Sequence, residues 1–201
     1  MSFSECGNTV SRACSFGLTS TERATEQDGS LPDPARVITT TNSQTGVSSI
    51  YTTLSESLPV TRNLGGTHIR LAYVSDRAPQ PLNGNGDLAA YGGFLENVPQ
   101  LVVPGGGSTV WYIDLAPGSE SPLHRTVSLD FVFLIEGELE LMIDSGETRM
   151  LRPGDTVIQR GTMHQWKNHS KDKWVRMIAV MAQCEPIVLD DGTELGSAGL
   201  G

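Results

Sequence analysis

Apolar and polar residues alternate with a period of two through much of the second half of this chain. Between residues 138 and 143, two leucines and an isoleucine occupy the odd positions, and the even positions hold Glu, Glu and Met. This alternation predicts a β-strand with one packed face and one largely wet face. Pairs that favour turns flank this segment and follow it: Glu136-Gly137, Ser145-Gly146 and Pro153-Gly154.

Further segments of the chain carry the same strand signal. The predicted strand segments are 36–54 (two strands around a turn), 68–76, 109–115, 129–170 (a continuous meander) and 173–186. A stretch rich in Pro, Asn and Gly at 78–87 interrupts the series, and we expect a short helical turn within 88–98. Short strands at regular spacing are typical of a sandwich or a small barrel, so the pattern predicts an all-β fold.

The length of 201 residues and the apolar content of 38% suffice for one substantial domain with a core. Residues 1–33 are rich in Ser, Thr, Gly and Glu without periodicity, which predicts a flexible N-terminal arm. We expect the barrel and its N-terminal strands to occupy 34–192, with the core motifs at 102–184. The segment 193–201 is predicted to be a frayed tail.

Charge, hydropathy and cysteine content bear on the class of partner and on the compartment. The net charge is −9 and no basic block stands out, which disfavours nucleic acid and anionic membranes as partners. No window is apolar enough to cross a bilayer, and the start lacks an apolar stretch of signal-peptide length, so we expect a cytoplasmic protein. Cys6, Cys14 and Cys184 show no metal-binding spacing, which favours free thiols in a reducing compartment.

The segment 121–137 combines a strand signal with candidate chemistry. His124 and Asp130 are six residues apart, an even spacing, so an extended chain projects both side chains from one face. Because the apolar run 131–135 leads into a buried sheet, this face points a histidine and a carboxylate toward the core.

Two stretches resemble the motifs of the cupin family. Gly118–Gly137 matches the spacing of the first motif, Gly-x5-His-x-His-x3-Glu-x6-Gly, and Gly154–Asn168 is similar to the second. The resemblance implies a double-stranded β-helix (jelly-roll) barrel with an N-terminal extension. More narrowly, the chain looks like the small single-domain cupins of fungi and some bacteria, several of which occur among polyketide-modifying enzymes.

The resemblance implies that His124, Asp130 and His164 bind a divalent metal and form the catalytic centre. The chain departs from the family pattern in three ways: Thr126 replaces a histidine, Asp130 replaces a glutamate, and the second motif is one residue shorter, with Gln159 where proline is usual. Two imidazoles and one carboxylate suit zinc, iron(II) or manganese and leave positions open for substrate. The alternative is a metal-free pocket in which Asp130 and the histidines form a hydrogen-bonded acid–base dyad.

Four neighbouring residues are candidates for substrate binding: Thr126, Gln159, Arg160 and Trp166. Trp166 shares a strand face with His164 by parity, and core packing explains it equally well. Arg160 could pair with a substrate carboxylate, although a solvated or ion-paired structural arginine is the more common situation.

Three functions remain open for such a centre. The first is a non-redox lyase, isomerase or cyclase of polyketide-like secondary metabolism, catalysing for example decarboxylation or dehydration. The second is an iron(II)-dependent dioxygenase, and the third is a non-catalytic small-molecule-binding cupin. In each case the partner is a small organic molecule. Many small cupins pair through their N-terminal strands, so the resemblance also implies a homodimer in which residues 36–42 take part.

Overall fold

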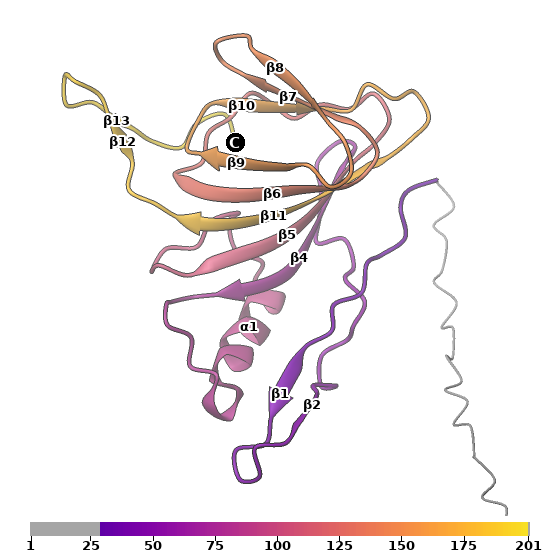
Figure 1. Ribbon diagram of the computed structural model, residues 1–201, viewed down its shortest axis with the longest axis vertical. Helices are drawn as coiled ribbons and strands as arrows, with labels where there is room; N and C mark the ends of the chain where they lie inside the picture. Colours follow the sequence, from indigo (N-terminus) through magenta and orange to yellow (C-terminus); the bar gives the residue numbers. More distant parts are fainter. Residues whose placement is uncertain (1–28, 201) are drawn as a thin grey trace, which may run out of the picture.

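The computed structural model describes residues 29–200, which form two antiparallel sheets that lie against each other as a barrel (Figure 1). The strands of the larger sheet are, in spatial order, β3 (Arg62–Asn63), β4 (Thr67–Ser75), β5 (Ser108–Leu115), β11 (Val175–Gln183), β6 (Ser128–Glu136) and β9 (Thr156–Arg160). Those of the smaller sheet are β10 (His164–Lys167), β7 (Leu139–Ile143) and β8 (Thr148–Leu151). This architecture confirms the predicted all-β barrel fold.

The chain changes sheets immediately after β6, where the sequence predicted a simple turn within a meander. β6 pairs with β9 and β11, whereas β7 pairs with β8 and β10. Gly137 makes the crossing with φ of +81°, and a Cβ there would lie 2.7 Å from a methyl carbon of Val175. A glycine is therefore required at 137 both for the backbone conformation and for the close approach of this crossing to the start of β11.

Smaller elements surround the barrel. β1 (Thr39–Thr41) and β2 (Ser48–Ile50) form the predicted hairpin, which stands away from the barrel in Figure 1. A 3-10 turn (Asn83–Asn85) leads into α1 (Gly86–Glu96), which begins two residues before the region 88–98 expected to be helical and overlaps most of it. β12 (Ile187–Val188) and β13 (Glu194–Leu195) form a last hairpin. No helix within residues 29–200 is long and apolar enough to cross a bilayer.

Where the structure describes them, the segments predicted to be a flexible arm and a frayed tail make specific contacts with the barrel. Residues 1–28 of the predicted arm lie outside the described residues, but Asp33 forms an ion pair with buried Arg70 at 2.9 Å. The predicted frayed tail includes β13 and a bridge between Ala198 and Arg125. Cys184 is a free thiol, and Cys6 and Cys14 lie outside the described residues.

The outer face of the larger sheet contains a buried ion network that sequence analysis missed. The Asp114 carboxylate accepts two hydrogen bonds from Arg176, at 2.7 and 2.6 Å, and one from Arg70 at 2.6 Å. The side chains of Asp114 and Arg70 are fully buried. The available signal was a single arginine or aspartate within each of three mainly apolar strands, β4, β5 and β11. Because the charges compensate one another, the network ties these three strands together.

Candidate functional site

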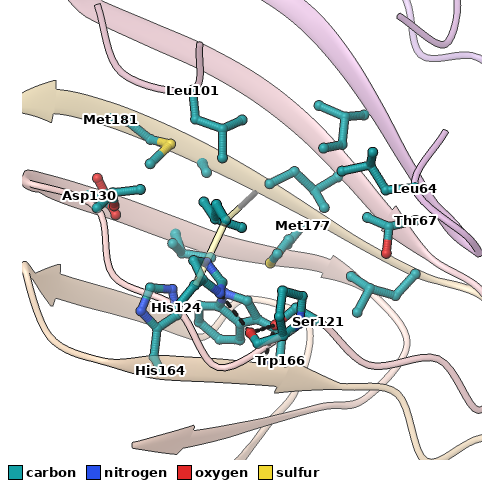
Figure 2. A pocket seen from close by; sticks show the side chains of 18 of the residues that line it. Leu64, Thr67, Leu101, Ser121, His124, Asp130, His164, Trp166, Met177 and Met181 are labelled. Carbon is teal, nitrogen blue, oxygen red and sulfur yellow. Dashed lines mark hydrogen bonds between the residues drawn. The ribbon is translucent and has the colours of Figure 1, made fainter. Parts of the chain in front are cut away.

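A pocket opens between the two sheets, and its walls are mostly apolar (Figure 2). Strands β4, β5 and β11 supply one wall, which consists of Ile69, Ile113, Leu115, Met177, Ala179 and Met181. The polar side chains His124, Asp130 and His164 line the same pocket. The cavity volume is about 120 Å³, close to that of a protein cavity that binds one benzene molecule, which sets the scale of a ligand.

The two histidines are brought together by direct backbone pairing. His124 and His164 exchange N–H···O hydrogen bonds of 2.9 and 2.8 Å, which join the segment before β6 to the first residue of β10. Their ring centroids are 4.2 Å apart, with an angle of 51° between the ring planes. Residues forty positions apart in sequence thus place two imidazoles side by side, as the motif spacing predicted.

Backbone carbonyls fix which nitrogen of each imidazole carries the proton. His124 Nδ1 lies 2.8 Å from the oxygen of Pro122, and His164 Nδ1 lies 2.9 Å from the oxygen of Thr162. Because a carbonyl oxygen only accepts, each Nδ1 must donate, which leaves each neutral Nε2 as an acceptor. Burial lowers the pKa of His124 and lowers the pKa of His164 to about 4, and both rings are therefore neutral at pH 7.

Asp130 is a buried carboxyl group without a full set of partners. Asp130 is 3% exposed, and its Oδ1 atom has no hydrogen-bond partner among the described residues. Burial raises the pKa of Asp130 to about 6, and a hydrogen bond with Ser128 opposes this rise. A buried carboxylate oxygen that lacks a donor costs free energy, so this group favours its protonated form or a ligand.

The two Nε2 acceptors and the open Asp130 oxygen are the donor types that a divalent metal prefers. Within residues 29–200, however, no group of three or more His, Cys, Asp or Glu side chains is arranged to hold a metal ion. Figure 2 shows the two imidazoles next to each other and the Asp130 carboxyl group apart from them, beside Met181. The histidine pair therefore fits a metal, and the third predicted ligand does not join it in this geometry.

The four predicted substrate-binding residues occupy different positions. Thr126 and Trp166 line the pocket, and the Trp166 ring meets His164 edge-on at 5.5 Å between centroids. Gln159 is buried opposite Asp130 in the β6–β9 pairing, but its amide donates to Thr162. Arg160 is exposed on the outer face, so the structure does not bring it to the pocket.

Several pocket residues escaped sequence analysis. The apolar side chains of β11 alternate inward, which parity could have shown once the direction of one residue was known. Leu200, from the segment predicted to be frayed, also lines the pocket. Nothing in the sequence could have indicated this contact, because it depends on where the chain returns after β13.

Comparison with known proteins supports the fold assignment. A family model described as a cupin domain matches residues 111–181. Phomopsin biosynthesis cluster protein D of Diaporthe leptostromiformis is 38% identical over 171 residues, which cover 85% of this chain and 89% of that protein. Oryzines biosynthesis cluster protein J of Aspergillus oryzae is 37% identical and covers 85% of this chain and 96% of its own length.

A third relative carries a name that describes a class of activity. It is a cupin-domain-containing oxidoreductase of Neurospora crassa, 37% identical over 161 residues that cover 80% of this chain and 79% of that protein. The matches extend well beyond the two histidine motifs and include most of the barrel. This chain therefore belongs to the cupin family.

Proposed function

We propose that this chain is an enzyme of secondary metabolism that moves protons on a small, largely apolar organic molecule. The reaction class is that of a non-redox lyase, isomerase or cyclase, with dehydration or decarboxylation as examples. The observation that carries the proposal is the mostly apolar pocket that holds the buried Asp130 carboxyl group together with two imidazoles whose Nε2 atoms accept. The names of relatives from fungal biosynthesis clusters support the metabolic setting.

The protonation preferences of the site support acid–base catalysis. Burial raises the pKa of Asp130 to about 6 and lowers the pKa of His164 to about 4, which reverses their order in water. Between about pH 4 and about pH 6, the Asp130 carboxyl group therefore retains its proton while the His164 imidazole is unprotonated. Two titratable groups held in opposite states are suited to act as an acid and a base.

A dehydration illustrates how the groups would act together. The Nε2 atom of His164 or His124 takes a proton from a carbon next to a carbonyl group. The Asp130 carboxyl group donates its proton to the hydroxyl group on the neighbouring carbon, which leaves as water while the C=C bond forms. The imidazolium then loses its proton and Asp130 regains one by exchange with solvent, which restores the starting state.

The remaining pocket residues would select the substrate. Met177, Ala179 and Met181 offer an apolar wall, and Trp166 supports the His164 ring at its edge. The Thr126 hydroxyl, which lines the pocket and lies 2.7 Å from that of Ser128, can form a further hydrogen bond with a polar substituent. A ligand with about six to eight non-hydrogen atoms matches the cavity.

A second candidate is an oxidoreductase, which is favoured by the names of relatives such as the Neurospora crassa protein. His124 and His164 would hold zinc, iron(II) or manganese through Nε2, with Asp130 as the third ligand after a change in its position. Iron(II) at such a site supplies oxygen activation, and zinc supplies Lewis-acid polarisation of a carbonyl group.

One assay separates the two functions. The purified chain is incubated at about pH 5, between the pKa values of His164 and Asp130, in anaerobic buffer with chelator. The substrates are a panel of β-hydroxy ketones and β-keto acids of about six to eight non-hydrogen atoms, and products are identified by mass spectrometry. We expect loss of water or carbon dioxide, and a decrease of about a hundredfold or more in Asp130→Asn and His164→Gln. Arg160→Gln, on the outer face, is the matched control and keeps full activity.

Two results would contradict the acid–base proposal. Turnover that requires oxygen and added iron(II), with an oxidised product, would establish the second candidate. Full activity in both Asp130→Asn and His164→Gln would remove these groups from the chemistry altogether.

We also propose that the protein forms a homodimer through its exposed apolar surfaces. Phe131, Phe133 and Ile158 are 37%, 38% and 51% exposed on the outer face of the larger sheet, and the β1–β2 hairpin exposes Val47 and Ile50. A second copy satisfies both surfaces, because each chain carries a sheet face and a hairpin. Light scattering should give a dimer mass for the parent and a monomer mass for Phe133→Lys; a monomeric parent would refute this.

A further inference from the structure

The last described residues of the chain run beside the strand segment that carries His124. We call Ser197–Leu200 the closing segment. Arg125 donates its N–H to the oxygen of Ala198 at 2.8 Å and accepts the N–H of Ala198 at 3.0 Å. The N–H of Val127 donates to the Ser197 hydroxyl at 3.3 Å. The closing segment is thus attached by backbone pairing to the residue that follows His124.

Gly199 fits this position because it has no side chain. Its φ is +79°, and a Cβ there would lie 2.2 Å from the oxygen of Leu123 and 2.9 Å from Cα of His124. Both neighbours are backbone atoms, which cannot rotate away as the end of a side chain can. The closing segment therefore contacts the His124 backbone at a distance that excludes every other residue type.

The next residue, Leu200, lines the pocket itself. Its side chain lines the same cavity as His124 and Pro122, and it is 44% exposed, which places it at the entrance. In Figure 1 the C-terminal end of the described chain lies near β10, whose first residue, His164, pairs with His124. An apolar side chain thus borders the route to the imidazole pair.

We propose that the closing segment determines substrate size, with Leu200 as the specificity-determining residue and Gly199 as the residue that positions it. The ligand class is a small organic molecule that directs a polar group toward His124 and an apolar edge toward Leu200. This inference deepens the proposed function, because the molecule concerned is its substrate. Release of the segment, or removal of the leucine side chain, widens the entrance for bulkier molecules.

The test uses acylation of His124, which needs an unprotonated imidazole and no substrate. Each protein reacts with diethyl pyrocarbonate, a small reagent, and with di-tert-butyl dicarbonate, a bulky one, and modified peptides are quantified by mass spectrometry. Exposed His169 serves as the internal reference in each reaction. Amide hydrogen exchange of the peptide that contains Arg125 and Val127 reports whether the closing segment is attached.

The variants separate attachment from size selection. Gly199→Ala should raise both the amide exchange and the bulky-to-small modification ratio at His124, by about tenfold or more, since three hydrogen bonds are lost. Leu200→Ala should raise the ratio without a change in exchange. Gly196→Ala is the matched control, because a Cβ there meets nothing within 4 Å, and it should behave like the parent.

Two outcomes would overturn the proposal. Faster exchange in Gly199→Ala with an unchanged ratio at His124 would show that the segment does not guard the entrance. Unchanged exchange in that variant would show that the segment is not attached. Because these readouts need no turnover, their failure is distinct from a failure of the acid–base assay, which in turn does not report on the entrance.

Discussion

Replacing Asp130 with asparagine should stabilise the metal-free protein near neutral pH. The carboxyl group is buried in an apolar pocket, and Oδ1 lacks a hydrogen-bond partner among the described residues. The folded protein therefore binds a proton at Asp130 more tightly than the unfolded chain does. Asparagine has nearly the same shape and carries no charge, so it removes the cost of burying the ionised form.

The magnitude follows from the shift in the pKa of Asp130. A rise from 3.8 to about 6 corresponds to about 3 kcal/mol of free energy of unfolding. Because the folded pKa is the higher one, the parent retains full stability below pH 4. It loses that amount as the pH rises through about 6. The variant should thus exceed the parent by about 3 kcal/mol at about pH 8 and match it at about pH 4.

Urea denaturation followed by tryptophan fluorescence, with chelator in every sample, measures this difference. Other groups titrate in the same range, but they titrate in both proteins, so the comparison isolates Asp130. Asp76→Asn, in an exposed pair with Arg77, is the control and should change stability little at either pH. Equal stability of parent and Asp130→Asn at both pH values would refute the reasoning, and so would a less stable variant at pH 8.

Two further predictions concern the opposite wall of the site and the outer face of the sheet. Burial lowers the pKa of His164 from 6.5 to about 4, so the folded state disfavours its protonation, and stability is lost as the pH falls through this range. In urea denaturation, the His164→Gln variant should lack this loss, about 3 kcal/mol; equal acid sensitivity of the two proteins would refute the burial effect. Asp114→Asn leaves Arg70 and Arg176 without their shared carboxylate, which should cost about 3–5 kcal/mol. Calorimetry should show a Tm lower by about 6–20 °C, and a drop of less than about 2 °C would show that the network is not important for stability.

The sequence was sufficient for the class of the fold and for the faces of its strands. The even spacing of His124 and Asp130 predicted that both point inward, and both line the pocket. This succeeds because the side-chain period of a strand is a local property of the extended backbone. The region 88–98, where a helical turn was expected, also overlaps α1.

Features that depend on contacts between distant parts of the chain could not be predicted from the periodicity of the strands. The alternation in 128–143 is the same whether β6 pairs with β7 or crosses to another sheet, so the meander prediction failed at Gly137. It failed again at Pro153-Gly154, where the chain returns from β8 to β9 in the larger sheet. The closing segment is rich in small residues, which resembles a disordered tail, yet its backbone pairs with Arg125. Only the full fold shows that the tail returns to the pocket entrance.

The separation of Asp130 from the imidazole pair has the same origin. Motif spacing predicts that three residues enter one cavity, but their mutual distances depend on how β6, β10 and the segment that carries His124 are placed in space. The exposed position of Arg160 is likewise fixed by its register opposite Leu129 on the outer face. Its role as a substrate-binding residue therefore lacks support from the geometry.

The protonation of the two imidazoles tests the central claim about this site most directly. Nitrogen-15 NMR of histidine-labelled protein at neutral pH, assigned with His124→Gln and His164→Gln, distinguishes the Nδ1–H tautomer, the Nε2–H tautomer and the imidazolium ion. We predict that both rings are neutral, with the proton on Nδ1 and an unprotonated Nε2 directed to the pocket. A proton on Nε2 of either ring, or a charged ring at pH 7, would contradict the acid–base site proposed for this cupin.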